Sequence, residues 1–315
     1  MNIGLIDVDN NNKKPKFPNL AIMKLSSYHK SLGDDVELAI PLKKYDIVYM
    51  SKIFDFTEEY NTILNCNNII KGGIGYDLEN KLSYEIEHFK PDYELYDIKD
   101  TAYGFITRGC PRNCEFCNVT QHQGNKSRIV TNVNEFWNGQ KNIVLLDPNI
   151  LACKEWKRVF QELIDTKSYI DFSQGLDIRF MTEEMILMLN NMKIKIIHFA
   201  WDYMKFEKII LERLELFKKI STISIRKIRI YVLINFDTTH EEDLYRINTL
   251  RKLGYDPYVM IYDKSKLSKG HINKRVQRWV NNVFIWRKCE TFAEYQNKII
   301  NKNQLSIYCL NGIKN

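Results

Sequence analysis

Residues 102–119 read AYGFITRGCPRNCEFCNV, and most of the fold can be worked out from this stretch. Its first six residues, 102–107, are mostly apolar and have the length of a buried strand. A loop with three thiols follows at once, and its residues Cys110, Cys114 and Cys117 are separated by three and two positions. We therefore expect a strand that ends directly at a cysteine-rich loop.

The same alternation of strand and helix signals continues along the chain. Further strands are predicted at residues 142–147, 169–178, 195–201, 228–234 and 257–262. Helical patterns lie between the strands, at residues 133–139, 154–164, 182–192, 204–220 and 240–254. Thr182 is the expected N-cap of one helix, and Gly254 is expected to end another. Six strands with five helical crossovers predict an α/β fold whose parallel sheet curls into a partial (β/α)6 barrel over residues 99–265.

The N-terminal residues show this alternation on a smaller scale. Strands are predicted at residues 2–8, 35–40, 46–51 and 66–73, and a helix that ends at Gly33 is predicted from residue 20. We expect a small doubly wound, Rossmann-like α/β domain with a connector over residues 1–98. Residues 266–315 are expected to form a basic helical extension.

Polar residues recur at the C-terminal ends of the strands predicted after residue 98, where parallel α/β folds place their sites. They are Asp147, Asn149, Asp177, Arg179, Asp202, Asn235, Asp237 and Asp263. Asp and Asn also begin ordinary loops, so either explanation holds for any single residue. The set as a whole favours a functional site.

Length and composition indicate a folded protein with a substantial core. The chain has 315 residues, of which 44% are hydrophobic. Its first residues contain no basic segment ahead of an apolar stretch, and no apolar run approaches the ~20 residues that span a bilayer. We expect a cytoplasmic protein with no membrane contact. In that compartment clustered thiols are metal ligands or catalysts more often than disulfides.

The basic residues are unevenly distributed. Residues 203–315 hold 22 Lys and Arg against 11 Asp and Glu, a net charge of +11, whereas residues 1–202 have a net charge of −4. This asymmetry fits an anionic partner, and a Lys-rich coding bias explains it equally well. Within residues 271–300, aromatic residues among the basic ones could stack on RNA bases or face a core.

Three chemistries are compatible with the cysteine loop. A structural zinc ion needs four ligands, and His122 is the nearest candidate for the fourth. A disulfide with a spare thiol does not suit a reducing compartment. A [4Fe–4S] cluster bound by three cysteines keeps one iron open, and an open iron is a reaction site.

The spacing Cys-x3-Cys-x2-Cys, with Phe116 just before the last cysteine, resembles the signature of the radical S-adenosylmethionine superfamily. Members of that superfamily carry the signature on the loop after the first strand of a partial (β/α)6 barrel. The resemblance implies that Cys110, Cys114 and Cys117 each ligate one iron of a [4Fe–4S] cluster. S-adenosylmethionine would chelate the fourth iron, and its reductive cleavage would give a 5′-deoxyadenosyl radical that abstracts a hydrogen atom from the substrate.

The resemblance also implies contacts for the cofactor. The turn Asp147, Pro148 and Asn149 matches a segment whose backbone carbonyls meet the amino group of the methionine moiety, although the two glycines and the Glu usual in that turn are absent. Phe116, just before the last cysteine, is also expected to contact the cofactor. Arg179 could meet the cofactor carboxylate, or could instead pair with Asp177 or Glu183. Asn235 stands where many members have a glycine near the adenine. Further contacts are expected, by position alone, from Gln174, Asp202 and Asp237.

An N-terminal α/β domain ahead of such a barrel is similar to the cobalamin-binding domain of one branch of the superfamily. That domain ligates cobalt through a His in an Asp-x-His-x-x-Gly loop, which this chain lacks, so no cobalamin is expected. His29 is expected on a helix surface. Cys66 alone cannot hold a second cluster, and Cys289 and Cys309 cannot hold an auxiliary one.

Substrate and reaction are not defined by these residues. The resemblance implies a small-molecule, peptide or RNA substrate and an electron donor such as flavodoxin or ferredoxin. The hypothesis from another class is a non-enzymatic binding module stabilised by zinc through the three cysteines and His122. A cluster-bearing electron carrier is a third hypothesis, although such a protein usually supplies a fourth thiolate.

Overall fold

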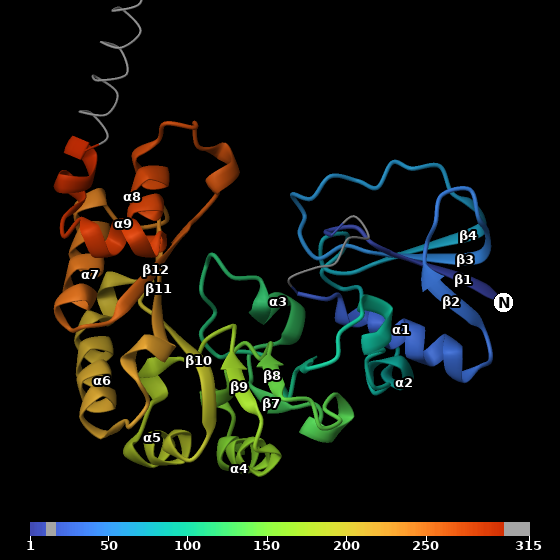
Figure 1. Ribbon diagram of the computed structural model, residues 1–315, viewed down its shortest axis with the longest axis horizontal. Coiled ribbons are helices and arrows are strands. Elements are labelled where there is room, and N and C mark those ends of the chain that lie inside the picture. The colour runs from blue at the N-terminus through green and yellow to red at the C-terminus, as the bar shows by residue number, and fades with distance from the viewer. Residues whose placement is uncertain (11–16, 299–315) are drawn as a thin grey trace, which may run out of the picture. The chain divides into compact units, whose positions relative to one another are not determined.

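The computed structural model describes residues 1–10 and 17–298. The protein has an α/β fold with parallel sheets, as the sequence predicts (Figure 1). Its chain forms two compact units. One comprises Met1–Gln174 with Asn191–Lys195, and the other comprises Gly175–Asn190 with the residues from Ile196 onward. The boundaries predicted near residues 98 and 265 remain predictions.

The first sheet is formed by four parallel strands in the order β2-β1-β3-β4. They are β1 (Asn2–Asp7), β2 (Asp35–Leu38), β3 (Lys44–Ser51) and β4 (Asn65–Gly72). Helix α1 (Leu20–Ser31) covers one face, where Ile3 and Leu5 pack against Ile22 and Leu25. Side chains alternate between the two faces of a strand, so Ile6 and Val8 belong to a second core on the other face.

This sheet differs from a doubly wound sheet on its second face. The connections over residues 39–43 and 52–64 contain no helix. Since β2 and β3 lie on opposite sides of β1, the short connection between them must pass across β1. Gly4 makes this possible, because a Cβ there would lie only 3.1 Å from the Tyr45 ring and 3.2 Å from the Ala39 side chain.

We expect Gly4→Val to lower the free energy of unfolding by about 1–3 kcal/mol, because the added methyl groups would overpack the contact of Ala39 with Tyr45. Chemical denaturation followed by circular dichroism measures the change. Gly270→Val is the matched control, since nothing lies within 4 Å of a Cβ at that position. Equal effects of the two substitutions would contradict the packing argument.

The helix α1 contains a residue whose predicted position is wrong. His29 is 4% exposed rather than on the surface. Its Nδ1 lies 2.7 Å from an Asp34 carboxylate oxygen, and its Nε2 lies 3.0 Å from the Tyr49 hydroxyl. The two polar partners satisfy both ring nitrogens, so the imidazole can be buried. Neither partner can be recognised from the residue spacing along α1.

The second sheet has the strand order β12-β11-β10-β9-β8-β5. A strand is present at each of the six predicted places: β5 (Thr101–Gly104), β8 (Asn142–Leu145), β9 (Tyr169–Phe172), β10 (Lys193–Ala200), β11 (Ile228–Ile234) and β12 (Asp256–Ile261). Strand β5 ends at Gly104 instead of residue 107, and β9 ends at Phe172 instead of residue 178. The chain turns after Phe172 and reaches a positive φ of 97° at Gly175, a conformation that a continuing strand cannot have.

Helices accompany this sheet largely as predicted (Figure 1). Thr182 caps α5 (Glu183–Asn190) by accepting a hydrogen bond from the Met185 amide, and Gly254 follows α7 (His240–Lys252) with a φ of 84°. The exception is residues 133–139, where only a 3-10 turn, η2 (Val133–Glu135), forms. The longer helices are α4 (Trp156–Thr166), α5 (Glu183–Asn190), α6 (Glu207–Ile220), α7 (His240–Lys252), α8 (Ile272–Asn281) and α9 (Val283–Lys288).

The aromatic residues of the basic C-terminal region mostly face a core. Trp279 and Trp286 are 0% and 6% exposed, and the Arg251 guanidinium lies over both rings. Asn281 in α8 pairs with both backbone groups of Val259 and so satisfies the free edge of β12. Only Phe284 of the three aromatic residues in α8 and α9 is exposed. Cys309 and the end of the predicted extension lie outside the described residues.

Within the described residues, no helix combines the length and the apolar character needed to cross a membrane.

Candidate functional site

The cysteine loop is closed at its base by two short antiparallel strands. They are β6 (Thr107–Arg108) and β7 (Arg128–Ile129). Gly109 follows β6 with a φ of 90°, and a Cβ there would lie 2.2 Å from the Lys126 carbonyl oxygen, so only glycine fits. The Cys110 amide then donates to the Gly124 carbonyl at 3.1 Å. Cys110 is therefore fixed at the base of the loop.

The three thiols differ in their surroundings. Cys110 and Cys114 are partly buried, whereas Cys117 is exposed. The Asn149 side-chain amide donates to the Cys110 sulfur at 3.5 Å, and the Cys117 amide donates to the Cys114 carbonyl at 3.0 Å. Over residues 1–10 and 17–298, no three His, Cys, Asp or Glu side chains are gathered closely enough to hold a metal ion.

Asp147 lies at the C-terminal end of β8 and holds the backbone that leads into the loop. Its Oδ1 accepts hydrogen bonds from the Ile106 amide at 2.9 Å, from the Thr107 amide and from the Thr107 hydroxyl at 2.8 Å. Asp147 is 3% exposed, and no described residue hydrogen-bonds to its Oδ2. Burial raises the pKa of this carboxyl to about 6, although its hydrogen bonds favour the charged form.

The raised pKa of Asp147 predicts a pH-dependent term in stability. A pKa near 6 in the folded state lies above the unfolded value of 3.8, so this group stabilises the fold below about pH 4 and loses that contribution as the pH rises through 6. Asp147→Asn keeps the acceptor oxygen and removes the charge. We expect it to abolish about 2–3 kcal/mol of the pH dependence of unfolding between pH 4 and 7.

Denaturant titrations at several pH values measure this difference. The control is Asp55→Asn, which removes the charge of an exposed carboxyl. A profile of Asp147→Asn that coincides with that of the native protein would exclude the proposed ionisation.

The other predicted residues of the first unit surround the loop in different ways. Phe116 and Pro148 are half-buried, and Gln174 is exposed. The Nδ1 of His122 lies 2.5 Å from the Leu78 carbonyl oxygen. The structure thus places Asn149 and Asp147 at the base of the cysteine loop, near Cys110. Gln174 is not among the residues that form these hydrogen bonds.

In the second unit, Arg179 pairs with Asp177, one of the two ion-pair partners considered from the sequence. Its guanidinium forms two hydrogen bonds to the Asp177 carboxylate, at 2.7 and 3.0 Å, and lies over the Phe206 ring at 4.4 Å. A contact of Arg179 with a cofactor carboxylate remains a prediction, and such a contact would compete with Asp177.

Asp202 is the second carboxyl with a strongly raised pKa. It follows β10 and accepts a hydrogen bond from the Leu233 amide at 3.1 Å. Burial raises its pKa to about 6, against the opposing effects of that hydrogen bond and of the nearby Arg246 and Arg179 charges. Asp202 and Arg179 therefore lie within electrostatic reach of each other.

Asn235 and Asp237 follow β11. Asn235 has a φ of 66°, which explains why Asn stands where the resemblance leads one to expect Gly. Its side chain is engaged at both ends, donating to the Tyr262 carbonyl at 2.9 Å and accepting from Asn273 at 3.0 Å. Asp237 is exposed.

The sequence pattern does not reveal three residues that organise these regions. Thr107 is 0% exposed, and both its hydroxyl and its backbone amide donate to the Asp147 carboxylate. Glu87 binds Arg108 across 21 residues, and Arg246 binds the Trp201 carbonyl across 45. Only Arg246 has a local signal, because Asp243 stands three residues before it on α7.

No protein-family model and no curated protein matches the chain.

Proposed function

We propose that this protein is a radical S-adenosylmethionine enzyme whose residues 99–265 form a partial (β/α)6 barrel. The observation that carries the proposal is the Cys-x3-Cys-x2-Cys loop, which follows β5 and the two-residue strand β6. Strand β5 is the first strand of a βα series in a parallel sheet. Polar residues at the ends of later strands support it, because sites in such folds lie at those ends.

The chemistry and spacing of the three thiols suit a [4Fe–4S] cluster, and binding would have to draw together side chains that the described residues do not gather. Three thiolates are soft ligands that suit iron, and the Asn149 amide hydrogen-bonds to the Cys110 sulfur at 3.5 Å, an interaction typical of cluster-ligating cysteines. When bound, the cluster would supply the electron that cleaves S-adenosylmethionine to methionine and a 5′-deoxyadenosyl radical. Cys110, Cys114 and Cys117 would each hold one iron.

The protein's own residues would act by positioning. Asp147 fixes the backbone before Cys110, and Asn149 orients that sulfur. In the proposed enzyme Phe116, Pro148 and Gln174 remain predicted contacts of S-adenosylmethionine. The same holds for the residues of the second unit, Arg179, Asp202, Asn235 and Asp237.

An external donor such as flavodoxin or ferredoxin would reduce the cluster, since the chain has no other thiol cluster in its sequence. The substrate would be a small molecule, a peptide or an RNA. No cobalamin is expected in the N-terminal region, because that region lacks the cobalt-ligating loop motif.

A zinc-stabilised binding module is the second candidate, and one contact favours it. The Nδ1 of His122 faces the Leu78 carbonyl oxygen at 2.5 Å, and a metal-ligating His usually donates its second ring N–H to such an acceptor. The Nε2 atom would then be available as a fourth ligand beside the three cysteines.

Anaerobic reconstitution with iron and sulfide distinguishes the two candidates. We expect the native protein to bind about four irons, and to release 5′-deoxyadenosine when dithionite and S-adenosylmethionine are added. Cys114→Ala should abolish the 5′-deoxyadenosine, because one iron loses its thiolate. His122→Ala should retain both the iron and the product.

The opposite pattern would support the binding module. A colourless protein that holds one zinc, loses it in His122→Ala and forms no 5′-deoxyadenosine would refute the enzyme proposal. Metal content by mass spectrometry and product by liquid chromatography give the two readouts independently.

A further inference from the structure

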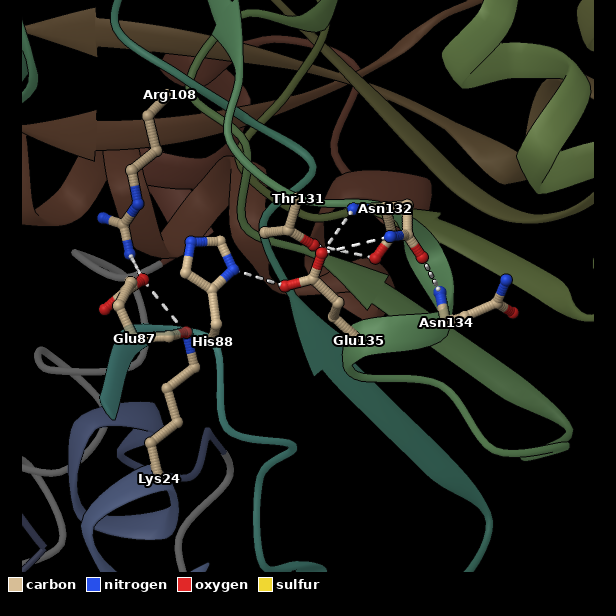
Figure 2. A network of polar contacts seen from close by, with 8 residues as sticks. All are labelled: Lys24, Glu87, His88, Arg108, Thr131, Asn132, Asn134 and Glu135. Carbon is tan, nitrogen blue, oxygen red and sulfur yellow. Dashed lines mark hydrogen bonds and ion pairs between the residues drawn. The ribbon is translucent and has the colours of Figure 1, made fainter. Parts of the chain in front are cut away.

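A network of charged side chains joins the first residues of the cysteine loop to the N-terminal helices. Figure 2 shows its members, which come from α1, from the region of α2 (Tyr84–Glu87), from β6 and from η2. Arg108, at the end of β6, stands two residues before Cys110. What holds Arg108 therefore also holds the point at which the loop begins.

Glu87 is the centre of this network. One of its carboxylate oxygens, Oε1, lies 2.7 Å from the Arg108 guanidinium and 3.0 Å from the Lys24 ammonium. Lys24 also donates to the Glu87 carbonyl at 2.5 Å. The Arg108 guanidinium also lies over the Phe105 ring, 4.1 Å from its centroid. Arg108 thus contacts both a carboxylate and an aromatic face.

The second part of the network supports the same helix end. The Nδ1 of His88 lies 2.7 Å from the Glu135 carboxylate, and Glu135 completes a capping box with Asn132 at η2. Neighbouring residues of one short helix are therefore tied both to β6 and to the segment that follows the loop.

The charges in this network are partly removed from water. The side chains of Lys24, Arg108 and Glu87 are 11%, 23% and 29% exposed. Burial lowers the pKa of Lys24, and the Glu87 charge opposes that effect. Burial alone would raise the pKa of Glu87, but the charges and hydrogen bonds of Lys24 and Arg108 together outweigh it and lower the pKa. Ion pairs of this kind are costly to break, since the remaining partner keeps an uncompensated charge.

The space around these residues is too small for a ligand. The cavity lined by Lys24, Glu87, Phe105, Thr131 and Glu135 has a volume of about 10 Å³. That is roughly the space of one water molecule. The charged side chains therefore pair with one another and leave no room for a ligand. We look for their role in the segments that they connect.

We propose that Glu87 is a positioning residue for the cysteine loop, and that it acts by fixing Arg108 and thereby the base from which Cys110 projects. Its effect on a bound cluster rests on the function proposed above, whereas its effect on the metal-free loop does not. Residues of the N-terminal α/β region would thus help to position the cysteine loop.

The first test uses the metal-free full chain. We expect Glu87→Ala to raise the rate of Cys110 alkylation by iodoacetamide at least about fivefold, because loss of a charge-assisted hydrogen bond frees Arg108 and the loop base. Peptide mass spectrometry reads the rate at each cysteine. Glu85→Ala is the matched control, since Glu85 is exposed on the same short helix.

A double-mutant comparison shows whether Glu87 acts through Arg108. Glu87→Gln keeps the size of the side chain, so it serves if the alanine variant fails to fold. We expect Glu87→Gln to increase Cys110 alkylation in the native background and to add nothing in an Arg108→Gln background. Additive effects, or a rate equal to that of Glu85→Ala, would overturn the proposal.

The second test uses the reconstituted protein. In Glu87→Gln the Arg108 charge loses its compensating carboxylate, and a positive charge near a cluster favours the reduced state. We expect the midpoint potential to rise relative to the native protein and to stay unchanged in Glu85→Gln. A lower cluster content at an unchanged midpoint potential would refute an effect of Glu87 on the bound cluster through the Arg108 charge. If the protein binds no cluster, the alkylation test still decides the positioning role.

Discussion

The hydrogen bonds of the buried Asp147 carboxylate are the constraint on which the cysteine loop depends. A parallel strand such as β5 ends with backbone amides that have no further strand partner, and buried amides must be satisfied. Asp147 meets this need for two successive residues, Ile106 and Thr107, from the end of the neighbouring strand β8. These hydrogen bonds fix the backbone at residues 106 and 107, and so fix the direction in which the chain enters β6 and the cysteine loop.

A comparable arrangement occurs in the second unit, with the opposite charge. Arg246 is 0% exposed and donates to the Trp201, Asp202 and Leu233 carbonyls, which lie at the ends of β10 and β11. Asp243 supplies the compensating carboxylate at 2.6 Å. In each unit a buried charged side chain thus forms the hydrogen bonds that backbone groups at the strand ends would otherwise lack.

Much of the fold follows from local patterns in the sequence. All six strands of the second sheet were predictable, because short apolar runs alternated with helical segments whose caps, Thr182 and Gly254, are local signals. The end of β9 and the turn at η2 were not predictable from these patterns. At both places the chain turns earlier than its apolar content suggests. The backbone there pairs with residues distant in sequence, since the Leu176 amide donates to the His198 carbonyl and the Val133 amide donates to the Glu162 carboxylate.

The candidate site divides in the same way. The sequence alone determined that three thiols at fixed spacing follow the first strand of a parallel α/β series, since spacing and strand order are properties of the chain. Only the tertiary structure decided that Asn149 contacts Cys110, that Arg179 pairs with Asp177, and that Glu87 reaches Arg108. Burial and pairing of polar groups depend on which residues folding brings together, and a charged side chain carries no local sign of the partner that it will find.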